Sequence, residues 1–314
     1  MRVAILGAGG VGGYFGARLA AAGHDVAFLA RGAHAEAMRR DGLRLESALG
    51  DVRIHPAAVF TDPGALGIAE LVIVAVKLWD SAAAMAALPA MTGATTAVVS
   101  LQNGIEKDEL LAAAVGPRAV VGGVTYISAT IAAPGVVRHV GALARLALGE
   151  LGGEPSARIA DLVAAFQAAG VAAEASPDVR RATWEKFVFL TAASAVNAVT
   201  RLPVGPLRRL PETRALFADA LAEGVALAAA EGADLGRDFV ERQMALLDGL
   251  APETRASMAQ DLLRGRRLEL EWLSGAIVRR AARLGLSTPV HRTLFAALAP
   301  YANGAPTGAA PPAP

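Results

Sequence analysis

Hydrophobic residues in the first half of the chain recur in short runs separated by polar or glycine-rich connections. The runs at 71–77 (LVIVAVK) and 97–103 (AVVSLQN) are almost continuously apolar, which is typical of central parallel strands covered on both faces. Between 119 and 151 the runs alternate and are separated by Ala133-Pro134-Gly135, so we expect antiparallel strands that extend the sheet edge. The other predicted strands are 2–6, 24–31 and 51–60.

The pattern changes near residue 176, where Ser176-Pro177-Asp178 is a typical helix start. From there on, apolar residues recur with helical spacing. A capping box, Ser257-x-x-Gln260, is expected to open the fourth helical segment. The predicted helical segments are 176–200, 211–232, 237–250, 256–285 and 291–303.

A glycine motif follows the first predicted strand: Gly7-Ala8-Gly9-Gly10-Val11-Gly12 lies between that strand and a helical pattern. In such a β-α-β unit Gly7 permits the tight turn, Gly9 lets the backbone approach a pyrophosphate, and Gly12 packs the helix close to the strand. The helix N-terminus then offers N–H groups to the phosphates. The alternative is a glycine-rich turn that binds nothing. The motif favours dinucleotide binding.

These patterns predict an α/β protein of two domains, as its 314 residues also suggest. We expect an N-terminal Rossmann dinucleotide-binding domain over residues 1–175 and an all-helical C-terminal domain over 176–302. The Pro/Gly/Ala-rich tail over 303–314 is expected to be disordered.

Composition limits the kinds of partner and site. The formal net charge is +1, so we expect no binding to nucleic acid or to an anionic membrane surface. The chain has no cysteine and its five histidines show no ligand spacing, so neither disulfides nor a metal site are expected. No apolar stretch approaches the roughly 18 residues of a membrane-spanning helix, and a cytoplasmic protein is the expectation.

Cofactor choice is read at the end of the second predicted strand, where NAD-dependent enzymes have an acid for the ribose 2′-hydroxyl. This chain has Ala30-Arg31 instead, and a guanidinium suits a 2′-phosphate, so NADP(H) is expected. The alternative is that Arg31 is a surface charge. Lys77 and Asn103 also stand at carboxyl ends of predicted strands, where parallel sheets bind ligands. For Asn103 the alternative is turn formation, because Asn-Gly is a strong turn dipeptide.

Lysine is scarce: of 30 basic residues, only Lys77, Lys107 and Lys186 are lysines. Arginine stays protonated in proteins, whereas the pKa of a lysine falls readily on burial. Lys77 and Lys186 are therefore the first candidates for chemistry. Lys107 lies in the polar stretch 106–109, which favours a solvated face.

Lys186 begins a stripe at helical spacing that continues through Leu190, Ser194 and Asn197. A lysine at the head of a mostly small and apolar stripe is expected to be partly desolvated, which would lower its pKa toward that of a useful acid. The alternative is a buried stem whose ammonium group extends to solvent.

The sequence resembles the ketopantoate reductase (2-dehydropantoate 2-reductase) family in the order of its motifs. These motifs are G-A-G-G-V-G, the strand-end Arg31, V-K-L-W, L-Q-N-G, W-E-K-F, and S-M-A-Q-D with L-E-L-E. The resemblance covers nearly the whole chain. It implies a Rossmann domain and a helical domain, with NADPH and a small 2-keto acid in the cleft between them. It also implies reduction of ketopantoate to pantoate, on the route to pantothenate and coenzyme A.

The resemblance also implies roles for the candidate catalytic residues. Lys186 corresponds to the general acid that protonates the carbonyl oxygen of the substrate. Asn103 corresponds to a residue that contacts both the nicotinamide ribose and the substrate. Glu269 corresponds to a carboxylate that orients the lysine and the cofactor, and its alternative is a solvated helix charge.

Further contacts with the cofactor and the substrate are implied in the same way. Besides the glycine motif with its Ala8, Gly10 and Val11, Arg31 and Lys77 correspond to contacts with the phosphorylated ribose. Ala129 corresponds to a backbone contact with NADPH. Ser257 resembles the ligand of the substrate carboxylate, and its alternative is a helix cap.

Three residues depart from the family pattern. Leu190 and Ser194 stand where well-characterised members have Asn, although Ser194 still counts as a candidate substrate contact. An apolar residue that faces a substrate hydroxyl costs discrimination. Asn197 lies roughly 16 Å along the helix from Lys186 and cannot replace them. Asp80 stands where Gln often helps to hold the 2′-phosphate, which an acid would repel.

Two alternatives to a ketopantoate reductase therefore stay open. One is a paralogous reductase of another 2-keto acid, which Leu190 and Ser194 favour. The other is a non-catalytic NADPH-binding sensor, against which Lys186, Asn103 and Glu269 argue. The apolar helical half could support a homodimer, and the sequence leaves the oligomeric state open.

Overall fold

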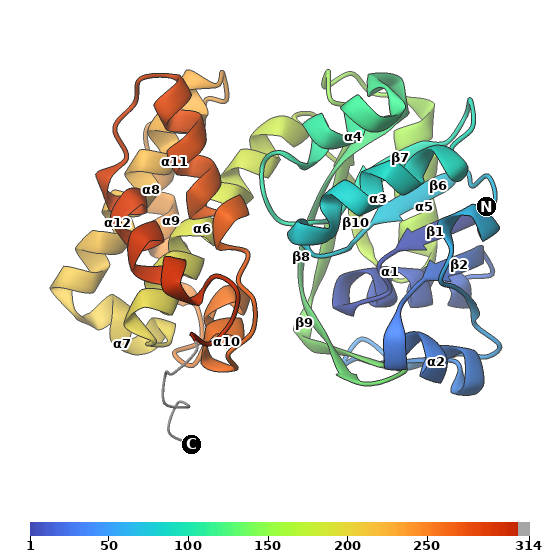
Figure 1. Cartoon of the computed structure of the whole chain (residues 1–314). Coiled ribbons are helices and arrows are strands. Elements are labelled where there is room, and N and C mark those ends of the chain that lie inside the picture. The colour runs from blue at the N-terminus through green and yellow to red at the C-terminus, as the bar shows by residue number, and fades with distance from the viewer. Residues whose placement is uncertain (307–314) are drawn as a thin grey trace. The chain divides into compact units, whose positions relative to one another are not determined.

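The structure is a computed structural model that describes residues 1–306. The chain divides into two units, Met1–Ala182 and Thr183–Pro314. The first unit is α/β and the second is helical, which confirms the predicted fold class (Figure 1). The division falls within helix α6 (Val179–Thr200), C-terminal to the predicted boundary at 175.

A parallel sheet forms the centre of the first unit, in the order β5 (Ala58–Phe60), β2 (Asp25–Leu29), β1 (Arg2–Leu6), β6 (Leu71–Val74), β7 (Ala97–Ser100) and β8 (Val120–Ala133). This is the order of a doubly wound Rossmann sheet, in which the winding reverses between β1 and β6. Every residue of β6 and β7 is buried, as their continuous apolar runs predicted.

Helices cover both faces of this sheet: α1 (Gly10–Ala21), α2 (Gly32–Asp41) and α5 (Ala157–Ala168) on one face, α3 (Ser81–Ala87) and α4 (Lys107–Val115) on the other. Successive side chains of a strand point to opposite faces. Ile5 of β1 therefore joins the core that contains Phe15 and Phe166, whereas Leu6 joins the core that contains Leu111. The rings of Phe15 and Phe166 meet edge to face at 5.9 Å between centroids.

The runs between 119 and 151 form one long antiparallel hairpin, in which β8 pairs with β9 (Val136–Gly149), as predicted. Three short strands extend this edge: β3 (Leu43–Glu46), β4 (Val52–Ile54) and β10 (Ala172–Ala175). The prediction of a single strand over 51–60 was wrong, because β4 and β5 lie at opposite ends of the strand order. Pro56 interrupts the run, since proline has no N–H to donate to a ladder.

The second unit consists of most of α6 and of α7 (Val204–Arg209), α8 (Pro211–Ala230), α9 (Phe239–Gly249), α10 (Ser257–Leu263), α11 (Ser274–Arg283) and α12 (Pro289–Leu298). At the start of α6, Asp178 accepts a hydrogen bond from the amide of Arg181 at 2.8 Å, which is N-cap geometry. The predicted segment 256–285 is divided into α10 and α11, with a 3₁₀ turn at Leu270–Trp272 between them.

The predicted capping box at Ser257 does not form. Ala256 is the N-cap of α10, and no side chain caps this helix. The side-chain amide of Gln260 instead donates to the carbonyl of Arg255 at 3.2 Å. Ser257 lies one position inside the helix, so its hydroxyl is not used for capping.

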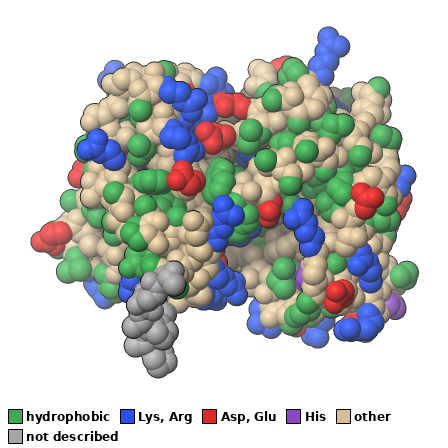
Figure 2. Space-filling view, viewed as in Figure 1, with side chains coloured by type: hydrophobic (Ala, Val, Ile, Leu, Met, Phe, Trp, Pro, Cys, Tyr) green, Lys and Arg blue, Asp and Glu red, His purple; other side chains and the backbone are tan. Residues whose placement is uncertain are grey.

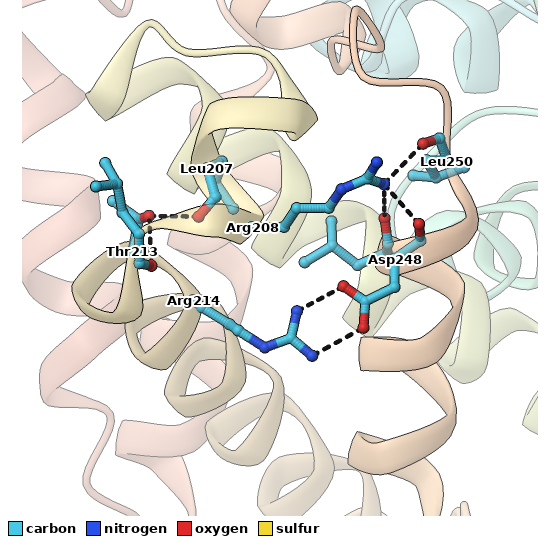
Figure 3. Close-up of polar contacts among 8 residues, drawn as sticks. Leu207, Arg208, Thr213, Arg214, Asp248 and Leu250 are labelled. Carbon is cyan, nitrogen blue, oxygen red and sulfur yellow. Dashed lines mark hydrogen bonds and ion pairs between the residues drawn. The ribbon is translucent and has the colours of Figure 1, made fainter.

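An arginine fastens the carboxyl end of α9 to α7. Nη1 of Arg208 donates to the carbonyls of Leu247, Asp248 and Leu250 at 3.1, 2.6 and 2.8 Å (Figure 3). Next to it, Arg214 of α8 forms a two-point ion pair with the Asp248 carboxylate, at 2.6 and 2.8 Å. A cation that binds the last carbonyls of a helix also complements the helix dipole.

The beginning of the predicted tail is hydrogen bonded. Asn303 forms an isolated β-bridge with Arg267, and the amide of Ala305 donates to the carbonyl of Gly265 at 3.2 Å. Residues 307–314 of the predicted tail lie outside the described residues.

None of the helices in residues 1–306 has the length and apolarity needed to cross a bilayer. Acidic and basic side chains are interspersed over the face drawn in Figure 2, in keeping with the formal net charge of +1.

Candidate functional site

The glycine-rich turn between β1 and α1 has the geometry of a phosphate-binding loop. Gly7 has a φ of +96°, a left-handed conformation that suits glycine. The amides of Gly7 and Ala8 both donate to the carbonyl of Leu29, at 3.1 and 3.2 Å, which ties the turn to the end of β2. Helix α1 begins at Gly10 without a capping side chain or an acidic residue in its first turn. Its first amides therefore suit an anionic group.

Close backbone contacts surround this turn. A β-carbon on Gly12 would lie 2.1 Å from the carbonyl oxygen of Gly7, and one on Gly10 would lie 2.1 Å from that of Ala129. At Gly9, by contrast, nothing lies within 4 Å of the position that a β-carbon would take. The backbone of Gly9 thus borders open space, which is what close approach of a pyrophosphate needs. The turn fits a dinucleotide.

The turns after β1 and β6 meet where the winding of the sheet reverses, the usual ligand site of such sheets. A β-carbon on Gly7 would lie 2.7 Å from the amide nitrogen of Val76. Lys77 follows, with an exposed side chain whose Nζ lies 5.5 Å from the ring centre of Trp79. The predicted strand-end lysine thus lies at this reversal point.

Arg31 lies at the N-cap position of α2, just after the end of β2. Its side chain is 69% exposed, and Nη1 lies 4.0 Å from Oδ1 of Asp80, whose side chain is 40% exposed. The two charged residues named in the sequence as favouring and opposing a 2′-phosphate therefore form a loose ion pair with each other.

Asn103 lies half-buried three residues beyond the end of β7, followed by Gly104 with a φ of +99°. Its neighbour Gln102, which sequence reasoning passed over, is buried and bridges two strand ends. The Gln102 side-chain amide donates to the carbonyl of Val76 at 3.0 Å and to the hydroxyl of Ser81 at 2.9 Å. Gln102 thereby holds the turn bearing Lys77 next to the turn bearing Asn103. The L-Q-N-G motif was the available signal.

Lys107 is not on a solvated face, and that prediction was wrong. Its side chain is 3% exposed, and Nζ donates to the carbonyls of Ser100 and Gly123, at 3.3 and 2.9 Å, and to the Asp108 carboxylate at 3.0 Å. All three ammonium protons are thus used. Lys107 joins β7 to β8 beside the turn that carries Asn103.

In the second unit, α6 is continuous from Val179 to Thr200, so Lys186 and the stripe that follows it share one face of a real helix. Lys186 is half-buried. Trp184 and Phe187, on either side of it, are 1% and 2% exposed and pack edge to face at 5.7 Å. These rings anchor the turn of helix that carries the lysine.

Farther along α6, the stripe becomes fully buried. Leu190 is half-buried, whereas Thr191 and Ser194 are both 0% exposed. Neither the Ser194 Oγ nor the Thr191 Oγ1 has a hydrogen-bond partner among the described residues. A buried hydroxyl without a partner is costly. Thr191 and Ser194 are therefore two residues of α6 whose buried hydroxyl groups make no hydrogen bond within the described residues.

Asn197 has a role that the sequence did not reveal. It is 1% exposed; Nδ2 donates to the carbonyl of Leu202 at 3.0 Å, and Oδ1 accepts from the amide of Ala256 at 3.1 Å. Ser257 follows Ala256 directly, is exposed, and its hydroxyl bonds to no described residue. Asn197 thus fixes the backbone that presents Ser257.

Glu269 is buried, at 6% exposure, and precedes the 3₁₀ turn between α10 and α11. The alternative of a solvated helix charge was therefore wrong for this residue. A carboxylate is rarely buried unless it is paired or hydrogen bonded. Glu269 therefore lies in the interior, where polar or charged contacts are needed to keep a carboxylate.

The structure thus gathers the candidate residues in two sets, one within each unit. The first unit contains the candidates beside the carboxyl ends of its parallel strands or against the glycine turn, namely Gly7–Gly12, Arg31, Lys77, Asn103 and Ala129. Lys186, Ser194, Ser257 and Glu269 lie in the second. No group of three or more His, Asp or Glu residues suited to a metal ion occurs within residues 1–306.

Comparisons with known proteins extend over both units. Residues 3–153 match the family described as Ketopantoate reductase PanE/ApbA, and residues 178–302 match its C-terminal family, Ketopantoate reductase PanE/ApbA C terminal. The chain is 35% identical to a 2-dehydropantoate 2-reductase of Halobacterium salinarum over 295 residues, which cover 94% of this chain and 96% of that protein.

Solved structures show the same relationship. A PanE/ApbA family ketopantoate reductase from Ralstonia eutropha matches with a TM-score of 0.88 and 38% identity, covering 96% of this chain and 98% of that one. D-mandelate dehydrogenase, in a complex with NADH and anilino(oxo)acetate, has the same TM-score and coverage but 21% identity, so this likeness concerns the fold alone. The chain therefore belongs to the ketopantoate reductase family of dinucleotide-binding oxidoreductases.

Proposed function

We propose that the protein uses NADP(H) to reduce the keto group of 2-dehydropantoate, with Lys186 as the proton donor. The observation that carries this proposal is the half-buried Lys186 on α6. It is the single lysine among residues 183–306, and the single histidine there, His291, is fully buried with both ring nitrogens engaged. The unit's other basic side chains are arginines, which cannot release a proton near neutral pH.

In the first unit, the glycine turn and the N-terminus of α1 would hold the pyrophosphate. Arg31, at the end of β2, would bind the 2′-phosphate, and no acid occupies the position that accepts from a ribose 2′-hydroxyl. Lys77 would add a second positive charge. Asn103, in the next turn along the strand ends, is assigned to the nicotinamide ribose and the substrate.

When the cofactor is bound, its nicotinamide would supply the hydride for the carbonyl carbon of the substrate. The carbonyl oxygen then takes up one proton, so that the 2-keto acid becomes a 2-hydroxy acid. Lys186 would donate this proton from Nζ, and Glu269, a buried carboxylate of the same unit, is assigned to orient the lysine. The exposed hydroxyl of Ser257, presented by the fixed Ala256 backbone, would bind the substrate carboxylate.

A second substrate class has support in Leu190 and Ser194. A half-buried Leu and a fully buried Ser hydroxyl stand where well-characterised members have Asn side chains for the substrate. A site that offers an apolar side chain there discriminates weakly in favour of a hydroxylated substrate. The second candidate is therefore a 2-keto acid with an apolar side chain.

A panel of 2-keto acids, assayed with the purified protein by the loss of NADPH absorbance, tests both candidates. We expect ketopantoate to be reduced with the highest kcat/KM, and Lys186→Ala to lower kcat by about 100-fold or more while NADPH still binds. A much higher kcat/KM for an apolar 2-keto acid would replace the first candidate by the second. Turnover of no keto acid by the wild type, with NADPH binding unchanged in Lys186→Ala, would instead identify a sensor.

A further inference from the structure

His34 reaches from α2 to two backbone groups on other elements. Its Nε2 lies 2.9 Å from the carbonyl oxygen of Ala8 in the glycine turn, and its Nδ1 accepts from the amide of Gly135 at 3.0 Å. Gly135 lies in the turn between β8 and β9. One imidazole therefore ties the candidate phosphate-binding turn to the hairpin.

The two partners fix the protonation state of this ring. A carbonyl oxygen only accepts and a backbone amide only donates, so Nε2 must carry the proton and Nδ1 must not. The neutral ring satisfies both partners. A second proton on Nδ1 would point at the N–H of Gly135, so the bond to Gly135 would be lost. Burial lowers the pKa of His34, and the hydrogen bond to Ala8 opposes this shift.

Neighbouring charges do not override this arrangement. The glycine turn and the β8–β9 turn contain no titratable side chain. On the elements packed around them, Arg31 of α2 pairs with Asp80 at 4.0 Å and Arg44 of β3 pairs with Glu46 at 3.2 Å. Arg138 of β9 pairs with the same Glu46 carboxylate at 2.8 Å, so each of these three cations is paired with a carboxylate. The shift in the pKa of His34 comes from burial and from the hydrogen bond to Ala8, and not from a charged group.

The turn that His34 holds has little freedom on its other side. A β-carbon on Gly10 would lie 2.1 Å from the carbonyl oxygen of Ala129 on β8, so the start of α1 already touches the hairpin. Ala8 lies between the left-handed Gly7 and the open space beside Gly9. The orientation of the Ala8 peptide thus decides how the following amides face a phosphate.

We propose that His34 is a positioning residue that holds the glycine turn in its binding conformation only while its imidazole is neutral, so that NADP(H) affinity falls on acidification. This inference rests on the proposed use of NADP(H). Near neutral pH the ring is neutral and the turn is held. Below the pKa of His34 the bond to Gly135 is lost, the turn loosens, and the cofactor dissociates more readily.

The test is the dissociation constant of NADPH, measured by cofactor fluorescence between pH 5 and 8, for wild type and His34→Gln. Gln can hydrogen bond but does not titrate in this range. NADH is titrated in parallel because it lacks the 2′-phosphate, whose own second pKa lies near 6, as for other phosphate monoesters. His55→Gln is the matched control, since His55 is exposed and bonds to no described residue.

We expect the wild-type constants for both cofactors to rise about 10-fold more than those of His34→Gln between pH 7.5 and 5.5, as the loss of one or two hydrogen bonds predicts. His55→Gln should follow the wild type. Coincident curves for wild type and His34→Gln would overturn the inference and leave the proposed function intact. Absence of NADPH binding to the wild type at every pH would overturn both.

A second measurement does not depend on a folded variant. Nitrogen-15 shifts of the His34 ring in the wild-type protein distinguish the Nε2–H tautomer from the Nδ1–H tautomer and from the charged ring. We expect the Nε2–H form at pH 7.5, with the charged form appearing over the range in which NADPH affinity falls. An Nδ1–H tautomer at pH 7.5 would contradict the inference.

Discussion

Nη1 of Arg31 lies 4.0 Å from Oδ1 of Asp80, across the turns that follow β2 and β6. The cation that would bind a 2′-phosphate therefore faces an anion that competes for it. Both side chains are well exposed, so the pair itself contributes at most about 1 kcal/mol. Breaking this ion pair so that Arg31 can bind a phosphate therefore costs little free energy.

Cofactor selectivity is expected to respond to both residues in opposite directions. Arg31→Ala removes a charge-assisted contact and should raise the KM for NADPH about 10-fold, with little effect on the KM for NADH. Asp80→Asn removes a repulsive charge and should lower the KM for NADPH by up to about 5-fold. Steady-state kinetics with both cofactors measure these effects. Equal changes for NADPH and NADH in Arg31→Ala would show that Arg31 does not read the 2′-phosphate.

Substrate binding is expected to depend on Asn197, although it lies far along α6 from Lys186, the proposed proton donor. Asn197→Ala leaves the amide of Ala256 without its partner and frees the backbone that presents Ser257. We expect the KM for the keto acid to rise about 10-fold while the dissociation constant of NADPH stays unchanged. Kinetics and cofactor titrations on the same preparation measure both quantities.

A double-mutant cycle separates this positioning role from general destabilisation. If Asn197 acts through Ser257, the effects of Asn197→Ala and Ser257→Ala on KM should be markedly less than additive. The matched control is Thr200→Val, because Thr200 is on the same helix and makes no bond to Ala256. Its hydroxyl donates to the carbonyl of Val196 at 2.6 Å and accepts from the amide of Leu202 at 3.3 Å, so the control also perturbs the segment at Leu202 that Asn197 binds. A control that raises KM as much as Asn197→Ala would contradict the positioning role.

His291 makes the folded protein sensitive to acid. The imidazole is 0% exposed, with Nε2 3.0 Å from the carbonyl of Ala220, and burial lowers its pKa to about 4. Between pH 6.5 and 4 the unfolded chain thus binds a proton that the folded chain does not. The stability contributed by the neutral ring is present above pH 6.5 and is lost as pH falls toward 4, by about 3 kcal/mol over the interval.

Urea unfolding at several pH values, followed by tryptophan fluorescence, measures this dependence. We expect His291→Gln to be less stable than the wild type at pH 7.5, because the buried site is remodelled, but to lose less stability on acidification. The two curves should converge as pH approaches 4. Parallel curves for wild type and His291→Gln would show that another group causes the acid sensitivity.

The two arginines drawn in Figure 3 should differ in their importance for stability. Arg208 is half-buried and its Nη1 binds three carbonyls, so Arg208→Met should lower the free energy of unfolding by about 2 kcal/mol. Arg214 and Asp248 are 38% and 46% exposed, and Arg214→Met should cost less than about 1 kcal/mol. Chemical denaturation of the two variants measures which substitution lowers the free energy of unfolding more. Equal losses would contradict the assignment.

The Rossmann domain was well predicted because its strands and its glycine turn have local signals. The apolar run around β6 and the glycine turn after β1 are each readable within ten residues. The division of 51–60 was missed, since the pairing partner of a short strand is chosen by tertiary contacts that a run of apolar letters does not specify.

Side-chain environment was harder to predict than backbone. Lys107 lies among Glu and Asp neighbours, yet its position at the first turn of α4 directs it to the end of β7 and the beginning of β8. Four polar letters cannot tell which face of a helix turns inward. The hydrogen bonds of Asn197 and His34 likewise join residues far apart in sequence, and no local pattern encodes them. Glu269 was placed by family resemblance rather than by its own surroundings.

The burial of Lys107 has a consequence for the reactivity of the folded protein. A lysine that is 3% exposed, with each proton engaged, is shielded from acylating or reductively alkylating reagents. The lysines left for such reagents are the exposed Lys77 and the half-buried Lys186. Covalent labelling of lysines in this protein therefore reports on two proposed functional positions, Lys77 and Lys186. Mass spectrometry can measure whether NADPH or a keto acid protects either lysine, and no substitution is needed.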